Sequence, residues 1–196
     1  ENASPERIKT LRVLGAELVM TDEMDGSDGA IIRARETAAA HPDRFYYADQ
    51  YNNPANWHAH YHTTGPEIVS QTQGRITHFV AGLGTSGTLM GVGRRLKKHN
   101  PDVKIVAVAP HPDDVIQGLR SLEQGFIPPI LDLSVLDARI MIDSDEAFAY
   151  TKKLVELEGV FAGISSGSVM AMTTQKSAPS AAVANHLWPL RTHSSP

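Results

Sequence analysis

Gly84 to Thr88 form the stretch of this chain whose residue types are best suited to chemistry. Two glycines enclose Thr85 and Ser86, so the backbone can turn tightly while hydroxyl groups remain available as hydrogen-bond donors. The apolar run from Ile76 predicts a strand before this turn, and the residues after it predict a helix. Such a junction points backbone N–H groups and the positive end of a helix dipole at one place, where a phosphate binds well. We therefore expect a phosphate site here; the alternative is a glycine turn that binds no ligand.

The kind of phosphate ligand follows from what the neighbouring sequence lacks. Gly82–Gly87 matches the dinucleotide pattern G-x-G-x-x-G, which needs an acidic residue about 20 positions later to hold a ribose. Asp113 and Asp114 come only after the prolines that follow the next expected strand, so this acid is poorly placed. A P-loop needs a lysine directly after its last glycine, and Thr88 occupies that position. These mismatches favour a small phosphate monoester over a nucleotide.

A second turn of similar composition occurs later in the chain. The segment Ala162–Gly167 places Ser165 and Ser166 next to glycines, ahead of an apolar helix start at Val169. Turns that follow the strands of one parallel sheet meet at the same edge of that sheet. We therefore expect Ser165 and Ser166 to lie at the edge of the site formed by the first turn.

Two further groups of polar residues allow more than one interpretation. Arg120 is either a solvent-exposed cation or a fork for an anionic substrate. His58, His60 and His62 would share one side of a strand and could then hold a metal, but no acidic partner is close in the sequence. Hydrogen-bonding or surface roles are favoured for these histidines, and no metal site is expected.

Helices and strands alternate along the chain, which predicts an α/β fold with a parallel sheet. Strands are expected at 16–21, 45–49, 103–109 and 138–142 and from residue 76, and helices from residue 5, at 30–40, from residue 64, after residue 87 and at 146–158. The polar stretch Gln50–Asn56 follows a strand, where open α/β sheets place ligand groups. Beyond Met172 no period of either kind remains. The expected division is part of a small N-terminal domain (1–48), part of a large phosphate-binding domain (49–172) and a disordered tail (173–196).

The composition is that of an ordinary soluble protein. The 196 residues are 41% hydrophobic with a net charge of −4, enough for one well-buried domain or slightly more. No basic cluster suits a nucleic acid, and no apolar run reaches the ~18 residues of a membrane span. The absence of cysteine excludes disulfides, thiolate zinc sites and cysteine nucleophiles. We expect a cytoplasmic protein whose partner is a small molecule, not a nucleic acid or a membrane.

Several separate motifs span most of residues 1–172: Glu1–Arg7, Leu14–Glu17, Gln50–Asn56, Thr63–Ile68, Ile76–Gly91, Gly125–Pro128 and Gly159–Gly167. In this order they resemble the cysteine synthase and cystathionine β-synthase branch of the pyridoxal-phosphate-dependent enzymes. The resemblance implies the three-layer, parallel-sheet fold of the tryptophan-synthase-β type, also called fold type II. It also implies pyridoxal 5′-phosphate as the cofactor, an amino-acid substrate, and a homodimer for the full-length relatives.

The resemblance assigns roles to the residues at matching positions. Gly84–Thr88 would hold the 5′-phosphate of the cofactor, and Gln50 would help to bind the carboxylate of the substrate. Gly118 falls in the loop that closes over the active site. Relatives that accept O-phosphoserine carry an arginine in this loop, which now favours a functional role for Arg120.

Two segments of the family have no counterpart in this sequence. The lysine that carries the cofactor as a Schiff base, and a loop that grips the substrate, would both precede Glu1. The lysines present lack the neighbours of the family lysine, the chain does not begin with methionine, and residues 173–196 are unlike the family. We therefore expect an internal piece of the enzyme, with no catalytic residue of its own and inactive by itself.

For the complete enzyme the resemblance implies cysteine biosynthesis. A sulfur nucleophile would replace the acetate of O-acetylserine or the phosphate of O-phosphoserine. One alternative is a non-catalytic remnant that still binds phosphate or pyridoxal phosphate. Another, suggested by the G-x-G-x-x-G match, is an NAD-binding oxidoreductase domain.

Overall fold

The computed structural model describes residues 3–123, 126–176 and 187–188. The chain divides into two compact units, residues 1–49 and residues 50–196. None of the helices in these described ranges is long and apolar enough to cross a membrane.

The first unit contains the helices α1 (Pro5–Val13) and α2 (Gly26–Ala40). Ser4 caps α1, because its hydroxyl accepts a hydrogen bond from the backbone N–H of Arg7 at 3.4 Å. Pro5 occupies the first turn, where its missing N–H costs nothing. The predicted start of this helix is therefore confirmed.

The strands expected at 16–21 and 45–49 are not formed, so this prediction was wrong. Both segments lie within the described residues, and neither is assigned as a strand. A strand is stabilised when a neighbouring strand takes up its N–H and C=O groups, and the described residues of this unit form two helices but no strand. Val19 and Tyr46 are accordingly 64% and 86% exposed. The apolar pattern indicated strands but not whether a partner strand was present.

The described residues of the second unit form a four-stranded sheet in the order β1-β2-β3-β4. The strands are β1 (His78–Gly82), β2 (Lys104–Pro110), β3 (Ala138–Ile142) and β4 (Leu187–Trp188). The first three are parallel, with Phe79 opposite Ile105 and Val108 opposite Ile140. The parallel sheet predicted from the sequence is therefore confirmed for these three strands.

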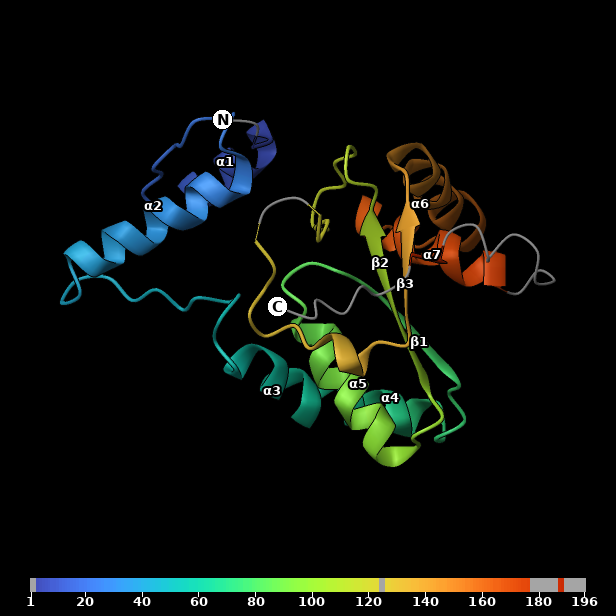
Figure 1. The fold of residues 1–196 in the computed structure, drawn as a ribbon. Helices are drawn as coiled ribbons and strands as arrows, with labels where there is room; N and C mark the ends of the chain where they lie inside the picture. Colours follow the sequence, from blue (N-terminus) through green and yellow to red (C-terminus); the bar gives the residue numbers. More distant parts are fainter. Residues whose placement is uncertain (1–2, 124–125, 177–186, 189–196) are drawn as a thin grey trace. The chain divides into compact units, whose positions relative to one another are not determined.

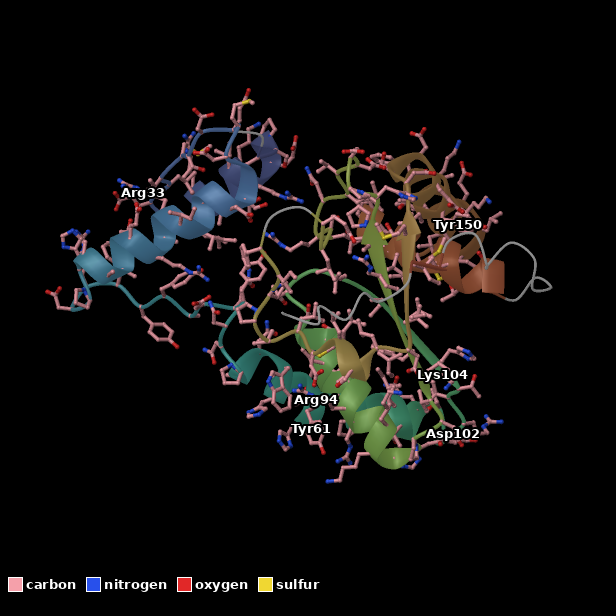
Figure 2. All side chains as sticks on the ribbon, in the orientation of Figure 1. Arg33, Tyr61, Arg94, Asp102, Lys104 and Tyr150 are labelled. Carbon is pink, nitrogen blue, oxygen red and sulfur yellow. The ribbon has the colours of Figure 1, made fainter. Side chains whose placement is uncertain are left out.

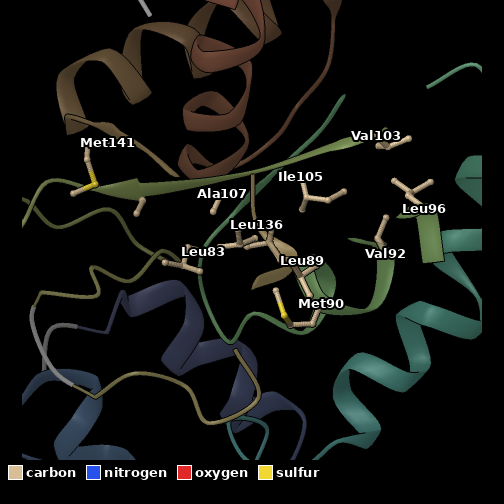
Figure 3. Close-up of a cluster of buried hydrophobic side chains, with 12 residues drawn as sticks. Leu83, Leu89, Met90, Val92, Leu96, Val103, Ile105, Ala107, Leu136 and Met141 are labelled. Carbon is tan, nitrogen blue, oxygen red and sulfur yellow. The ribbon is translucent and has the colours of Figure 1, made fainter. Parts of the chain in front are cut away.

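Helices cover both faces of the sheet. One face carries α3 (Ala55–His62), α4 (Thr64–Gln71) and α5 (Gly87–His99), and the other carries α6 (Ser144–Glu158) and α7 (Ile164–Lys176) (Figure 1). Alternate residues of β2 point to the two faces. Ile105 packs with Leu89 of α5 in one buried cluster (Figure 3), and Val106 packs with Ala171 of α7 in another. This is the expected three-layer α/β architecture.

Two glycines inside α5 allow the neighbouring elements to approach closely. A Cβ atom on Gly91 would lie 2.3 Å from the carbonyl oxygen of Trp57 in α3, and one on Gly93 would lie 3.0 Å from Cγ1 of Val135. Arg94 of α5, labelled in Figure 2, stacks over the Trp57 ring of α3 at 4.3 Å from its centroid, and Arg95 lies over the Tyr61 ring at 5.8 Å. This close packing of α3 against α5 brings His60 of α3 within 3.3 Å of Thr88 of α5.

Regular structure continues beyond Met172, which corrects the expectation for residues 173–196. The helix α7 runs to Lys176, and Leu187–Trp188 pairs antiparallel with β3. Met172, the last residue before the expected tail, is 2% exposed and belongs to the core between α7 and the sheet. The other residues of the expected tail lie outside the described residues.

Candidate functional site

The glycine-rich turn connects the end of β1 directly to the start of α5. The N–H of Leu83 still donates to the carbonyl oxygen of Val108 at 2.7 Å, and the helix begins at Gly87. Ser86 is the N-cap residue, with a φ of 75° in the left-handed region, and its hydroxyl makes no capping hydrogen bond. The first N–H groups of a helix have no acceptor within that helix. Apart from the N–H of Gly87, which donates to Oγ1 of Thr85 at 3.4 Å, they are therefore available to an anion at this turn.

The Ser86 hydroxyl is buried without a hydrogen-bond partner among the described residues, and a ligand could supply one. The residue is 3% exposed. A buried polar group left without a partner costs about 1–3 kcal/mol. A left-handed backbone at a residue other than glycine adds strain of a kind that gathers at functional sites. A ligand that accepts a hydrogen bond from Ser86 would offset the first of these costs.

Gly84 and Gly87 are required by close contacts on either side of the turn. A Cβ atom on Gly84 would lie 2.9 Å from the carbonyl oxygen of Gly118, and one on Gly87 would lie 1.9 Å from Oδ1 of Asn56. Real Cβ atoms do not approach other atoms so closely. The two glycines therefore let the β2–β3 loop and the start of α3 close around the turn.

Asn56 is a residue of the site that the sequence did not single out. Its Nδ2 donates to the carbonyl oxygen of Gln50 at 2.7 Å and to Oγ1 of Thr85 at 3.1 Å. The same Oγ1 accepts the N–H of Gly87 at 3.4 Å. Since both lone pairs of Thr85 are then used, its own hydroxyl proton remains to be donated to a ligand. The only signal in the sequence was that Asn56 ends the polar stretch Gln50–Asn56.

One cavity of about 690 Å³ brings most of the expected site residues together. Gly84–Thr88, Gly118, Ser165 and Ser166 all line it. Its volume is typical of small-molecule sites, which span roughly 300–1,000 Å³. None of the described residues that line it is charged. An anion in this cavity would therefore be held by hydroxyl and N–H donors and by the α5 dipole, without a carboxylate nearby to repel it.

Ser165 and Ser166 reach this cavity in a different local structure from the one expected. The sequence predicted a loop up to Gly167, but α7 begins at Ile164, so both serines lie in its first turn. The glycine serves packing: a Cβ atom on Gly167 would lie 2.2 Å from the carbonyl oxygen of Ala147 in α6. The turn composition was misread because a glycine needed for helix contact looks the same in sequence as a glycine needed for a turn.

Gln50 and Arg120 are not among the residues that line the cavity, but the structure ties each to it. Gln50 is connected through Asn56, as described above. The backbone N–H of Arg120 donates to the carbonyl oxygen of Leu83 at 2.7 Å, directly before the turn. Its half-buried guanidinium lies over the rings of Tyr51 and Phe126, 5.3 and 4.3 Å from their centroids. Arg120 is therefore not a freely solvated cation.

The three histidines of α3 do not share one side of the element, since this segment is a helix. His60 bridges two threonines instead, with Nδ1 3.0 Å from Oγ1 of Thr64 and Nε2 3.3 Å from Oγ1 of Thr88. The hydrogen-bonding interpretation is thus confirmed for His60. In the part of the chain that the structure describes, no group of three or more metal-ligating side chains could hold a metal ion.

The loop that carries Gly118 is anchored by two carboxylates. Asp114 accepts a hydrogen bond from the N–H of Ser144 at the start of α6, and Glu123 forms an ion pair with Arg139 of β3, which is 4% exposed. Burial raises the pKa of both carboxyls. Several hydrogen bonds and nearby charges together outweigh this effect, the largest being the bonds from Ser144 to Asp114 and from Arg139 to Glu123, so the pKa of each lies below its ordinary value. Both carboxylates therefore stay ionised and hold the loop in place.

Comparison with known proteins gives the family. The family model described as "Pyridoxal-phosphate dependent enzyme" matches residues 1–184. The chain belongs to this family of pyridoxal-phosphate-dependent enzymes. The family cofactor is pyridoxal 5′-phosphate. The uncharged, donor-rich turn, whose Ser86 hydroxyl has no hydrogen-bond partner among the described residues, fits the phosphate of that cofactor.

Relatives of this pyridoxal-phosphate-dependent chain include named cysteine synthases. The cysteine synthase of Aquifex aeolicus (strain VF5) is 46% identical over 170 residues, which cover 86% of this chain and 52% of the relative. Cysteine synthase A of Escherichia coli (strain K12) is 41% identical over 186 residues, covering 87% of this chain and 58% of the relative. The crystal structure of an O-ureido-L-serine synthase matches with a TM-score of 0.84 at 35% identity, over 92% of this chain and 59% of that one. The chain thus spans somewhat more than half the length of these relatives, and the match confirms the predicted fold class.

Proposed function

We propose that this chain forms the cofactor-phosphate-binding part of a cysteine synthase. The observation that carries the proposal is the buried Ser86 hydroxyl, which has no partner among the described residues and lies in the cavity-lining turn at the start of α5. The names of the relatives support the reaction. The complete enzyme would replace the O-linked group of O-acetylserine or O-phosphoserine by a sulfur nucleophile to give cysteine.

In this proposal the turn Gly84–Thr88 anchors the 5′-phosphate. The hydroxyls of Thr85 and Ser86 and the first N–H groups of α5 donate to its oxygens, and the helix dipole favours its negative charge. Pyridoxal phosphate, when bound, supplies the electron sink that lets an amino acid lose its α-proton and its β-substituent. The protein contributes a fixed position for the cofactor and so for the substrate.

The remaining site residues are proposed to orient the substrate. Gln50 would bind its carboxylate, because the Asn56 side chain holds the Gln50 backbone beside the turn. Gly118 lines the cavity with a backbone φ of 90°, a conformation that residues other than glycine rarely adopt. Its loop would cover the bound substrate. Ser165 and Ser166 would form the opposite edge of the cavity.

Arg120 is proposed to recognise the leaving group, which makes O-phosphoserine a substrate as well as O-acetylserine. The Arg120 backbone is fixed to Leu83, and two aromatic rings hold its guanidinium at a defined place near the turn. A guanidinium held in this way can bind a phosphate by paired hydrogen bonds. A relative named for O-ureido-L-serine indicates that this fold serves more than one O-substituted serine.

The polypeptide of 196 residues is proposed to be inactive by itself. No lysine is among the described residues that line the cavity. After mixing with pyridoxal phosphate and borohydride reduction, peptide mapping should find no single preferred lysine. Adding the part of a relative that this chain lacks should restore cysteine formation. Preferred labelling of one lysine would contradict the proposed inactivity, and binding without restored activity would favour a non-catalytic binding protein.

Calorimetric titration with pyridoxine 5′-phosphate tests the site directly, because this ester lacks the aldehyde that reacts with lysines. We expect binding of the phosphate ester and none of unphosphorylated pyridoxine. NAD should bind more weakly, since Asp114, an acid after β2, is engaged by Ser144. Equal binding of pyridoxine and its phosphate would overturn the phosphate assignment, and tighter NAD binding would favour the oxidoreductase alternative.

A further inference from the structure

His60 lies directly behind the phosphate-binding turn. Its Nε2 is 3.3 Å from Oγ1 of Thr88, in the first turn of α5, and its Nδ1 is 3.0 Å from Oγ1 of Thr64, the first residue of α4. Thr88 lines the cavity, whereas His60 does not. Among the described residues, the hydrogen bond that joins the imidazole to the cavity lining is therefore the one with the Thr88 hydroxyl.

The contact between His60 and Thr88 depends on Gly91, which lets α3 approach α5 closely. Gly91 lies three residues after Thr88 and so on the same side of α5. A Cβ atom on Gly91 would lie 2.6 Å from Cβ of His60, so any other residue would push α3 away. The close approach of the helices thus brings the imidazole within hydrogen-bonding distance of Thr88.

The direction of the His60–Thr88 hydrogen bond decides what Thr88 can offer to a phosphate. A threonine hydroxyl has one proton, and a neutral imidazole has one N–H donor and one acceptor nitrogen. If Nε2 carries the proton, it donates to Thr88, and the Thr88 proton is left to point elsewhere. If Nδ1 carries the proton, Thr88 must donate to Nε2, and only its lone pairs are left to face the phosphate. Thr64 is compatible with either arrangement, because its hydroxyl can donate to Nδ1 in the first and accept from Nδ1–H in the second.

We propose that His60 is a positioning residue that holds the Thr88 hydroxyl as a hydrogen-bond donor to the cofactor phosphate, through its Nε2–H tautomer. The inference rests on the proposed phosphate site at Gly84–Thr88. In this arrangement the bonds run in one direction, from Thr64 to His60, from His60 to Thr88, and from Thr88 to the phosphate. A phosphate dianion accepts hydrogen bonds only, so its binding selects this direction.

A double-mutant cycle with pyridoxine 5′-phosphate as the probe tests the proposal in the whole chain. His60→Leu removes the imidazole, and we expect about tenfold weaker binding, the scale of one hydrogen bond to a charged group. His60→Gln keeps an N–H donor and should recover most of the affinity. In a Thr88→Val background His60→Leu should have little further effect. His62→Leu changes an exposed histidine of the same helix and is the matched control.

The tautomer of His60 can be measured independently by ¹⁵N NMR of the histidine rings in the wild-type protein. This measurement tests the proposal even if a variant does not fold. We expect Nε2 of His60 to be the N–H nitrogen when the phosphate ester is bound. An N–H at Nδ1 in the complex would overturn the proposal, as would unchanged affinity in His60→Leu while Thr88→Val weakens binding. In both cases the phosphate site itself stands. Absence of any binding by the wild type would instead overturn the phosphate site, and the inference with it.

Discussion

Asn56 donates a side-chain hydrogen bond to Thr85, a residue of the proposed phosphate site. The side-chain amide of Asn56 lies 3.1 Å from Oγ1 of Thr85 and 2.7 Å from the carbonyl oxygen of Gln50. One side chain at the start of α3 thus joins the turn after β1 to the segment that carries Gln50. This link connects the proposed phosphate-binding and carboxylate-binding residues.

Replacing Asn56 should therefore affect both stability and binding. Asn56→Ala removes two hydrogen bonds, and we expect the free energy of unfolding to fall by about 1–3 kcal/mol in urea denaturation. Binding of pyridoxine 5′-phosphate should weaken as well. Asn56→Asp keeps the shape but places a carboxylate near the phosphate, so it should bind still more weakly. Wild-type affinity in both variants would show that Asn56 does not orient Thr85.

Gly87 should not tolerate even one added methyl group. In Gly87→Ala the new Cβ would lie 1.9 Å from Oδ1 of Asn56, so one of the two elements must move. We expect a loss of about 1–3 kcal/mol in the free energy of unfolding. Gly163→Ala is the matched control, because no atom lies within 4 Å of its added Cβ. If thermal melting showed equal stability for the two variants, the tight packing of the turn would be in doubt.

Replacing Ser86 by glycine should stabilise the ligand-free protein and weaken ligand binding. Ser86→Gly relieves the left-handed backbone, where φ is 75°, and removes a buried hydroxyl without a partner among the described residues. The ligand-free protein should become more stable by about 1 kcal/mol, measured by urea denaturation. The same variant should bind pyridoxine 5′-phosphate more weakly. Ser86→Ala removes only the hydroxyl and separates the two effects. A destabilised variant with normal binding would mean that Ser86 has a structural role alone.

The ion pair of Glu123 with Arg139 should make stability depend on pH. Burial raises the pKa of Glu123, but the hydrogen bonds from Arg139 and Ser121 and the positive charge of Arg139 together lower it below its ordinary value in the folded protein. Its contribution is fully present above the pKa of an unfolded glutamate, about 4.3, and is lost as pH falls through the lower folded pKa. In urea denaturation at several pH values, the wild type should exceed Glu123→Gln at neutral pH, and the difference should shrink in acid.

Two comparisons make the Glu123 measurement specific. Glu67→Gln on α4 changes an exposed glutamate and should follow the wild-type curve. Arg139→Met leaves Glu123 without its cation, so it should reduce stability at neutral pH as Glu123→Gln does. A stability difference between wild type and Glu123→Gln that stays constant down to acid pH would be inconsistent with a lowered pKa.

Arg120 should distinguish the two candidate substrates in a completed enzyme. Arg120→Ala removes the guanidinium that is proposed to bind the phosphate leaving group, so the kcat/KM for O-phosphoserine should fall by at least about tenfold. The kcat/KM for O-acetylserine should change less, because acetate offers no dianion. Arg120→Lys keeps the charge but loses paired hydrogen bonding and should be intermediate. An equal fall for both substrates would argue against leaving-group recognition.

Local patterns in the sequence predicted much of the second unit. The glycines of Gly84–Thr88, between an apolar run and a helix, indicated a tight turn between a strand and a helix, and the β-rich residues of β2 indicated a strand. Such features depend on backbone freedom and side-chain polarity, which each segment carries by itself. The prediction of strands at 16–21 and 45–49 was wrong, because a strand depends on a partner strand that the segment itself does not specify.

By itself, the sequence determined which residues can turn tightly and donate hydrogen bonds, and through its ordered motifs it indicated the family. Only the tertiary structure decided which of these residues meet. It placed Asn56 and His60 against Thr85 and Thr88, although 29 and 28 positions separate the pairs in the chain. It also buried the Ser86 hydroxyl without a partner among the described residues. Hydrogen bonding and burial between distant segments depend on how helices pack, and this is fixed by the shapes of surfaces such as Gly91 against α3, not by any one stretch of sequence.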